Sequence, residues 1–326
     1  KNGEIEKSYH HFKKYFELNE EIKHTNTDVK LKGLQLKFDV DEAKKESELY
    51  RLKNIDLVNA NTEIERQKQE ILAKNIEITD SIVYAKRIQN AMLPDLNLLN
   101  EVATEYFVLF KPKDIVSGDF YWLAENDDCV YFAVIDCTGH GVPGAFLSII
   151  ANNLFNKAVY EQQLSGTDEI LNYVHQEIIS SLNKKATDSG KDGMDVALCS
   201  IDKKRKTLTY SGAYNPICIF RNDNLTEIKA DKFIIGNSLI TQQHLFTPHT
   251  VDLQKNDMVY LFTDGFADQF GGPKGKKFKS KNLKKLFSQL AQYNCEVQFN
   301  KMEQIFTEWK GNLEQIDDIC IMGVKI

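Results

Sequence analysis

Residues 1–94 show a different pattern of apolar and polar positions from the rest of the chain. Glycine occurs there only at Gly3 and Gly33, proline is absent before Pro94, and Glu, Lys, Asn and Gln dominate. One apolar series recurs at every seventh position: Ala43, Tyr50, Leu57, Ile64, Ile71, Ile78, Ala85 and Met92. This pattern predicts a long helix that ends at Pro94.

The same segment leaves two interpretations of its packing open. The residues three places after each member of the apolar series are mainly polar, as at Lys53, Gln67 and Lys74. A coiled coil normally has two apolar seams. We favour a dimeric coiled coil over a long amphipathic helix that lies on its own or a neighbouring domain. Residues 4–22 also look like the last helix of a tetratricopeptide-type repeat. We therefore interpret residues 1–94 as a helical region for signalling and homodimerisation.

The pattern changes near residue 104, where short apolar runs typical of strands replace the helical spacing. These runs are 106–110, 120–123, 130–135, 196–201, 207–210, 217–220 and 319–324. Helical spacing predicts helices at 144–160, 170–182, 281–293 and 296–310, and Pro143 opens the first of them. Strands and helices in blocks indicate an α+β fold of stacked layers over residues 95–326.

Composition and charge narrow the class of protein. The chain has 326 residues and is 42% hydrophobic, which is enough to build a sizeable core. Its net charge of -6 disfavours nucleic acid and anionic membrane surfaces as partners. Six cysteines stand without a Cys-x-x-Cys pair, and we find no signal peptide and no apolar run of about 18 residues. We expect a cytoplasmic protein with reduced thiols and no membrane segment within this chain.

Four short motifs place an aspartate where an apolar run meets a turn, and they carry the candidate chemistry. Their aspartates are Asp119 after Ser-Gly, Asp136 after Val-Ile, Asp264 in Thr-Asp-Gly, and Asp317 in Ile-Asp-Asp. Each motif alone is also a common turn. Carboxylates that converge above a core repel one another unless cations lie between them. Oxygen ligands favour Mg²⁺ or Mn²⁺ over zinc.

Taken together, the four motifs resemble the metal-dependent protein phosphatase family, which has the protein phosphatase 2C fold, in its bacterial stage II sporulation E type. The resemblance runs from about Ala85 to the C-terminus. Three further segments match this type: residues 86–94 (KRIQNAMLP), 110–112 (FKP) and 139–145 (GHGVPGA).

The resemblance implies a four-layer α-β-β-α sandwich of two antiparallel sheets. It implies that the catalytic carboxylates Asp119 and Asp136 bridge or flank two divalent cations, Mn²⁺ or Mg²⁺. The backbone carbonyl of Cys137, Asp264 and Asp317 would complete the ligand set, with Asp318 beside it. A metal-activated water would hydrolyse phosphoserine or phosphothreonine without a phosphoenzyme. The implied partner is a phosphorylated signalling protein, often an anti-sigma factor antagonist.

Some residues near the motifs depart from the family pattern. Eukaryotic members hold the substrate phosphate with an arginine, and here the nearest cations are Lys111 and Lys113, of which we retain Lys113 as the candidate. His140 follows Asp136 by four positions instead of two, so we predict a structural role for its side chain. Asp192 and Asp195 lie where some relatives bind a third metal, and Asp195 is the candidate there.

Two other chemistries and one non-catalytic role are alternatives to a metal-dependent phosphatase. Cys199 and Arg205 have the Cys-x5-Arg spacing of cysteine-dependent phosphatases, but the residues between them contain no glycine to form a phosphate cradle. A nucleotide cyclase would need a Gly-rich cradle as well. An inactive phosphatase-like domain that serves as a scaffold or binding module is the alternative to the enzyme. The presence of all four aspartates favours the enzyme.

Overall fold

The structure is a computed structural model that describes residues 2–182, 193–236 and 246–326. Contacts along the chain separate two compact units, residues 1–77 and residues 78–326. Asp192 of the sequence-based predictions lies outside the described residues. The second unit contains the last turns of the N-terminal helix together with both sheets, so the candidate site lies wholly within it.

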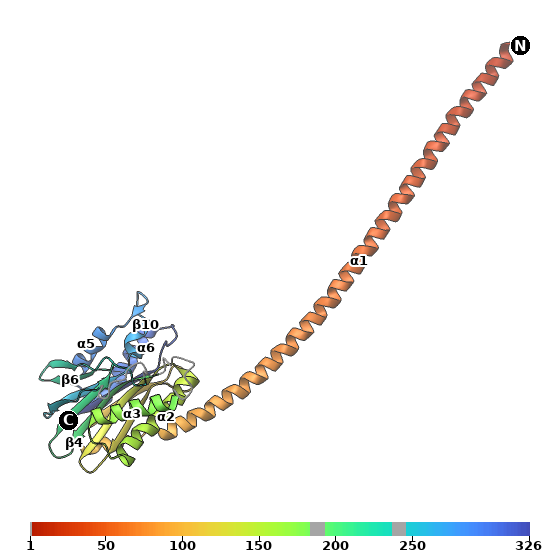
Figure 1. Ribbon diagram of the computed structural model, residues 1–326. Coiled ribbons are helices and arrows are strands. Elements are labelled where there is room, and N and C mark those ends of the chain that lie inside the picture. The colour runs from red at the N-terminus through yellow and green to blue at the C-terminus, as the bar shows by residue number, and fades with distance from the viewer. Residues whose placement is uncertain (1, 183–192, 237–245) are drawn as a thin grey trace. The chain divides into compact units, whose positions relative to one another are not determined.

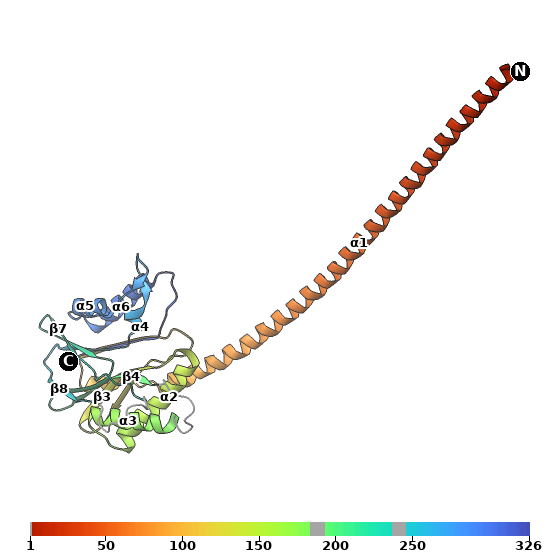
Figure 2. The same cartoon turned by 45° about the horizontal axis from the view of Figure 1, so that its top comes forward.

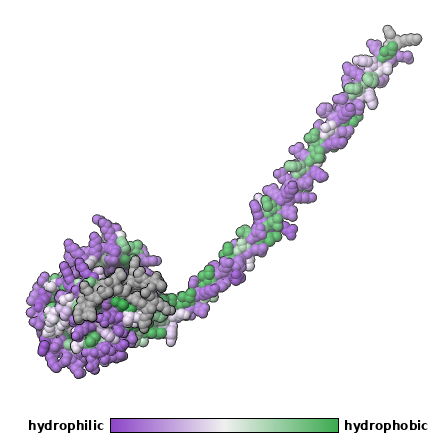
Figure 3. Space-filling model, viewed as in Figure 1, coloured by the Kyte–Doolittle hydropathy of each residue, from purple (hydrophilic) through white to green (hydrophobic). Residues whose placement is uncertain are grey.

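The predicted long helix is confirmed: α1 runs from Asn2 to Met92 and stops just before Pro94. Its apolar side chains in the first unit, among them Ile64 and Ile71, are exposed. Figure 3 shows green apolar patches interrupted by purple polar ones along this helix. In the described parts of the chain, we find no helix with the length and apolarity that a membrane crossing would require.

Residues 105–325 form two five-stranded antiparallel sheets. The first has the order β1 (Glu105–Lys111), β12 (Ile319–Lys325), β9 (Met258–Phe262), β6 (Ile217–Arg221) and β7 (Asn224–Ile228). The second has the order β2 (Phe120–Glu125), β3 (Cys129–Cys137), β4 (Met194–Asp202), β5 (Thr207–Ala213) and β8 (His249–Asp252). A short hairpin of β10 (Phe270–Gly271) and β11 (Lys276–Lys277) stands apart from both.

Helices cover the outer face of each sheet, which confirms the α-β-β-α sandwich (Figure 2). On the second sheet lie α2 (Gly141–Asn156), continued by a π-helical turn at Lys157–Glu161, and α3 (Thr167–Leu182). On the first lie α5 (Ser280–Leu290) and α6 (Cys295–Lys310). A 3₁₀ helix (Leu96–Glu101) follows α1, and the one-turn helix α4 (Gly265–Asp268) follows β9.

Strand β3 shows how the sequence builds both cores at once. Successive side chains of a strand point to opposite faces. Tyr131, Ala133 and Ile135 pack in the core under α2 and α3, whereas Phe132 and Val134 pack between the two sheets. Because both faces are buried, residues 130–135 form the continuous apolar run seen in the sequence.

The remaining differences from the sequence-based prediction concern short elements. Strands β7 and β8 were not predicted, and each shows partly exposed or exposed side chains. Both are edge strands, since each pairs with one neighbour only. An edge strand covered on one face lacks the apolar run that reveals a central strand. Strand β9, Met258 to Phe262, is the apolar run expected before Asp264, although the sequence analysis gave it no bounds.

Candidate metal centre

Asp119 is buried at the start of β2, where its segment meets the start of α2. A side chain at Gly118 would collide with the carbonyl oxygen of Gly139, so only glycine permits this approach. Gly144 of α2 lies against the same carbonyl and against Gly118. The approach places Asp119, with 2% of its surface exposed, beside the end of β3.

Asp136 and Asp195 lie opposite each other on neighbouring strands. In the antiparallel register of β3 and β4, Asp136 pairs with Asp195. Directly opposed like charges destabilise a sheet pair. Asp195 was predicted as the candidate ligand of a third metal, and the structure places it beside Asp136 in the cluster. The cross-strand register that places it there could not be read from the sequence.

Asp264 and Asp317 come together because their strands are neighbours. In β9 and β12, Phe262 pairs with Ile321. The pairing continues beyond β9, where the N–H of Thr263 donates to the Cys320 carbonyl at 2.9 Å. Asp264 therefore follows the end of one strand, and Asp317 precedes the start of the next.

Asp318 differs from Asp317, because both of its carboxylate oxygens are already occupied. Its Oδ1 accepts the backbone N–H of Lys113 at 2.7 Å, and its Oδ2 accepts that of Gly118 at 2.8 Å. The side chain is buried, with 2% of its surface exposed. Asp318 therefore ties the loop before β2 to the start of β12. Asp317 is half-buried, and its Oδ1 accepts the N–H of Asp318 at 2.9 Å.

The five remaining carboxyl groups perturb one another. Burial raises the pKa of Asp119 well above its usual range, and the charge of Asp136 raises it further. The pKa of Asp136 is also raised well above its usual range, first by burial and then by the charges of Asp264 and Asp317. The pKa of Asp195 rises to about 7 through burial and the charge of Asp264. Burial and Asp317 raise the pKa of Asp264 to about 6, and burial raises that of Asp317. Five separate segments thus bring their charges within electrostatic reach of each other.

The donor set suits divalent cations, although the side chains do not converge on one point. Across the described residues, no three His, Cys, Asp or Glu side chains are assembled closely enough to hold a metal ion. Within the cluster, the buried Asp119 Oδ2 nevertheless has no hydrogen-bond partner. A buried carboxylate oxygen without a donor is costly. Hard cations with oxygen ligands would satisfy it.

A polar chain of three side chains lies beside the carboxylates. His140 Nδ1 is 2.7 Å from Asp114 Oδ2, and His140 Nε2 is 3.0 Å from Lys113 Nζ. The charges of Lys113 and His140 both lower the pKa of Asp317, against the effect of burial. Lys111 instead pairs with Glu303 of α6 at 2.7 Å. Asp114 was not singled out in the sequence, because nothing in its spacing marks it as the partner of His140.

The cysteines are poor nucleophiles. All six are free thiols, and burial raises the pKa values of Cys137 and Cys199 well above their usual range. Cys199 lies in the middle of β4 and is fully buried. The Cys-x5-Arg spacing therefore has no accessible thiolate, as expected from the missing glycines.

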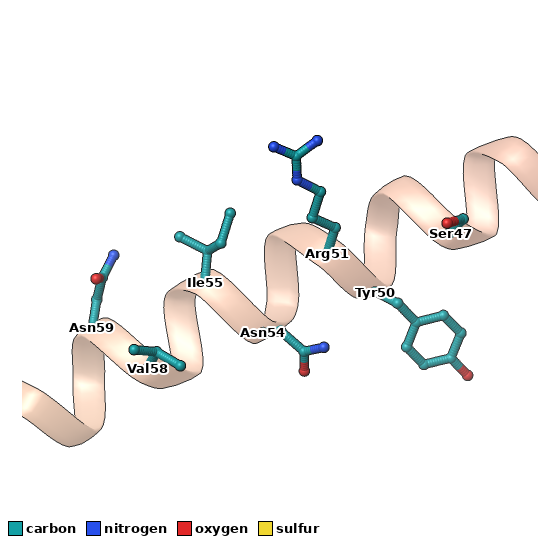
Figure 4. Close-up of a pocket in the computed structure, with 7 residues that line it drawn as sticks. All are labelled: Ser47, Tyr50, Arg51, Asn54, Ile55, Val58 and Asn59. Atoms are coloured by element: carbon teal, nitrogen blue, oxygen red, sulfur yellow. The ribbon is translucent and has the colours of Figure 1, made fainter.

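A depression on α1 does not compete with the carboxylate cluster as a site. It is lined by Ser47, Tyr50, Arg51, Asn54, Ile55, Val58 and Asn59, all from one helix. Figure 4 shows the side chains of Tyr50 and Arg51 pointing away from each other. Residues of a single helix surface cannot surround a ligand, and no group of convergent titratable side chains lies there.

Comparisons with known proteins agree with this fold and site. Residues 126–326 match the family model described as Stage II sporulation protein E (SpoIIE). The SiaA-PP2C domain of Pseudomonas aeruginosa has a similar structure, with a TM-score of 0.70 and 31% identity, over 78% of this chain and 99% of that chain. The PP2C phosphatase domain of SpoIIE from Bacillus subtilis, solved with a fragment of its regulatory domain, has a TM-score of 0.56 and 18% identity. It covers 68% of this chain and 63% of that chain, and it shares the fold.

A curated relative gives the same class. Phosphoserine phosphatase RsbU from Bacillus subtilis (strain 168) is 22% identical over 198 residues, which is 59% of this chain. The chain spans 55% of the length of that relative. The fold and the carboxylate cluster define a domain of the PP2C protein phosphatase class. Within that class, the chain belongs to the SpoIIE family.

Proposed function

We propose that the chain is a metal-dependent phosphatase that removes phosphate from phosphoserine or phosphothreonine of a signalling protein. The observation that carries this proposal is that Asp119, Asp136, Asp195, Asp264 and Asp317 lie within electrostatic reach of one another, with Asp119 Oδ2 buried and unpartnered. Mutually repelling carboxyl groups cost stability. Their placement at the ends of five strands is explained by a task that needs them.

The chain's own residues prepare the reaction. Asp119 and Asp136 would hold two cations, Mn²⁺ or Mg²⁺, with Asp264, Asp317 and the Cys137 carbonyl as further ligands and Asp195 beside them. The bound cations supply an activated water and charge neutralisation for phosphoryl transfer. Asp318 holds Gly118, and with it Asp119, against β12. Lys113 would bind the substrate phosphate as a point charge, with its amine positioned by His140.

The substrate is proposed by class. Relatives of the SpoIIE type point to a phosphorylated partner-switching protein, such as an anti-sigma factor antagonist. The unpaired state of all six cysteines supports a reducing compartment, and we propose the cytoplasm.

Helix α1 is proposed to regulate the domain and to form a homodimer. Its apolar series repeats at strict sevens, and such a series drifts by about 20° per heptad around a straight helix. Two such helices would bury the series by supercoiling. Whether residues 4–22 end a tetratricopeptide-type array stays a prediction. Sedimentation of the chain should show a dimer that Ile64→Lys with Ile71→Lys converts to a monomer. A wild-type monomer would contradict the coiled coil.

The function is tested with Asp136→Asn and with EDTA. The purified chain should hydrolyse p-nitrophenyl phosphate and phosphoserine peptides only with Mn²⁺ or Mg²⁺. Asp136→Asn should lower kcat by about a hundredfold or more, since one of the groups that bind the cations is lost. The control is Asp127→Asn, an exposed carboxyl of the β2–β3 turn, which should retain activity. A folded wild type that hydrolyses neither substrate with either metal would favour the scaffold alternative.

A further inference from the structure

A lysine-rich segment lies next to the carboxylate cluster. Residues 273–285, here called the basic segment, contain seven lysines and no acidic residue, although the chain carries a net charge of -6. The lysines are Lys274, Lys276, Lys277, Lys279, Lys281, Lys284 and Lys285. The segment covers the tip of the β10–β11 hairpin, β11 itself and the first half of α5. Dense like charge on a folded surface indicates an interaction surface.

The basic segment is held rigidly by the residues at its base. A side chain at Gly272 would collide with the indole ring of Trp309, and the N–H of Gly272 donates to the Trp309 carbonyl at 2.8 Å. The ring of Phe278 meets that indole edge to face at 5.1 Å. The N–H of Phe278 donates to the Gln269 carbonyl at 3.0 Å. The lysines are therefore presented from a fixed frame, and Figure 1 shows β10 at the base of a projecting hairpin.

Most of these lysines do not serve the fold. Lys277 pairs with Asp268 at 2.7 Å, and Lys284 pairs with Glu227 at 2.6 Å. The other five have no ion pair with any residue that the structure describes, and all five are exposed: Lys274, Lys276, Lys279, Lys281 and Lys285. Lys279 has a φ of 75° and a ψ of 141°, a backbone conformation that suits glycine far better than lysine.

The basic segment borders the proposed metal centre. Asp264 begins the turn that leads through α4 to Asp268, the partner of Lys277. On the other side, Gln269 Oε1 accepts the N–H of Ile316, next to Asp317, at 3.2 Å. A substrate whose phosphate is bound by cations at Asp264 and Asp317 would therefore lie close to the end of the basic segment that contains Lys277.

We propose that the basic segment is a docking surface for acidic residues that flank the phosphorylated serine or threonine of the substrate protein. The proposal rests on the proposed phosphatase function and adds a substrate preference to it. A folded protein substrate can offer a few carboxylates beside one phosphate. A membrane surface or nucleic acid would instead place its continuous negative charge over the carboxylate cluster as well, and that cluster would repel it.

The test compares two phosphoserine peptides of equal length, one flanked by glutamates and the other by glutamines. The peptide ratio is the kcat/KM for the acidic peptide divided by the kcat/KM for the neutral one. It is measured at low salt for the wild type and for one variant that carries Lys274→Glu, Lys276→Glu and Lys281→Glu together. The ratio should fall about tenfold in this variant, because charge complementarity governs association. Hydrolysis of p-nitrophenyl phosphate, which has no flanking residues, should change by about twofold at most.

A matched variant controls for net charge. Lys204→Glu, Arg205→Glu and Lys255→Glu combined reverses three exposed charges in the β4–β5 turn and before β9. Lys204 and Arg205 follow the last residue of β4, whereas Asp195 lies near the first. At about 3.3 Å per residue, the strand separates Asp195 from this turn by about 23 Å. The peptide ratio should stay at its wild-type value. An equal fall in both variants, or no fall in the first, overturns the proposal.

Salt dependence and membrane binding complete the test. If the first variant does not fold, the wild type alone decides. Raising salt to about 0.5 M should then lower the peptide ratio, because it screens exposed charges, and an unchanged ratio overturns the proposal. Binding to vesicles of phosphatidylserine tests the competing explanation. If the first variant loses vesicle binding while its peptide ratio stays at the wild-type value, the basic segment binds membranes and the proposal of substrate docking is overturned. Failure to hydrolyse any of the three substrates would instead refute the phosphatase function itself.

Discussion

Gln89 near the end of α1 and Ser117 before β2 are joined by two reciprocal hydrogen bonds. The Gln89 Nε2 donates to the Ser117 carbonyl at 2.6 Å, and the Ser117 N–H donates to Gln89 Oε1 at 3.0 Å. The same Nε2 donates to Ser148 Oγ of α2 at 2.9 Å. Gln89 is 4% exposed. One buried amide thus connects the N-terminal helix with both segments that surround Asp119.

Replacement of Gln89 should weaken both the fold and the site. Gln89→Leu leaves the Ser117 N–H without its partner, at a cost of about 1–3 kcal/mol in the free energy of unfolding. Because Ser117 is two residues from Asp119, we also expect weaker Mn²⁺ binding. Thermal unfolding and metal titration measure the two effects. Asn90→Leu, at the exposed neighbouring position, should change neither. Equal effects in the two variants would remove the proposed link from α1 to the site.

Without metal, the protein should lose stability as pH rises. The native pKa values of Asp119 and Asp136 lie well above 3.8, and that of Asp195 is about 7. Between the unfolded and native pKa values, the native state binds more protons, so the free energy of unfolding falls as pH rises. His175, whose pKa is lowered by burial, acts in the opposite direction below its ordinary value of 6.5. Thermal unfolding in EDTA at several pH values measures the sum.

Asp136→Asn isolates the contribution of the cluster. It removes one of the repelling carboxyl groups, so metal-free Asp136→Asn should be more stable than the wild type at about pH 8. Manganese at a hundred times its Kd should stabilise the wild type by about 2.7 kcal/mol and the variant much less. A variant less stable than the wild type in EDTA would show that the carboxylates do not repel.

Substitution of Asp318 should lower stability, whereas substitution of Asp317 should lower Mn²⁺ affinity. Asp318→Asn places an amide donor against one of two backbone N–H groups, so the metal-free protein should lose about 1–3 kcal/mol of stability. Asp317→Asn keeps an oxygen for the Asp318 N–H and should leave that stability unchanged or higher. Its Mn²⁺ affinity should fall instead. Thermal unfolding in EDTA and metal titration give both quantities, and the reverse pattern would exchange the two roles.

Lys113→Ala should raise KM for a phosphoserine peptide with little change in kcat, because a charge that binds the phosphate in both ground and transition states is lost. Asp114→Asn tests the polar chain behind it, since the Asp114 carboxylate contacts His140, which in turn contacts the Lys113 amine. It should raise KM less than Lys113→Ala does. Unchanged kinetics in Lys113→Ala would leave the lysine without a role in binding.

The sequence predicted the central elements because their signals are local. Residues 130–135 are apolar on both faces, and residues 43–92 repeat every seven positions, so the strand and the helix could be read directly. The Asp136–Asp195 pair could not, because it depends on the register between two strands and the two residues are 59 positions apart in the sequence. Gln89 was part of a matching segment, but its partner Ser117 is 28 residues away. The division of labour between Asp317 and Asp318 likewise rests on backbone donors from distant loops.

The burial of both faces of β3 restricts how this domain can diverge. A one-residue shift turns every side chain of a strand to the opposite face. A single inserted residue within Cys129–Ile135 would exchange the intersheet core with the helix-facing core and point Asp136 away from Asp119. Substitutions that conserve volume can accumulate in this strand, whereas insertions and deletions cannot. Length variation among related chains is therefore expected in turns such as residues 126–128, and the spacing from Tyr131 to Asp136 should be invariant.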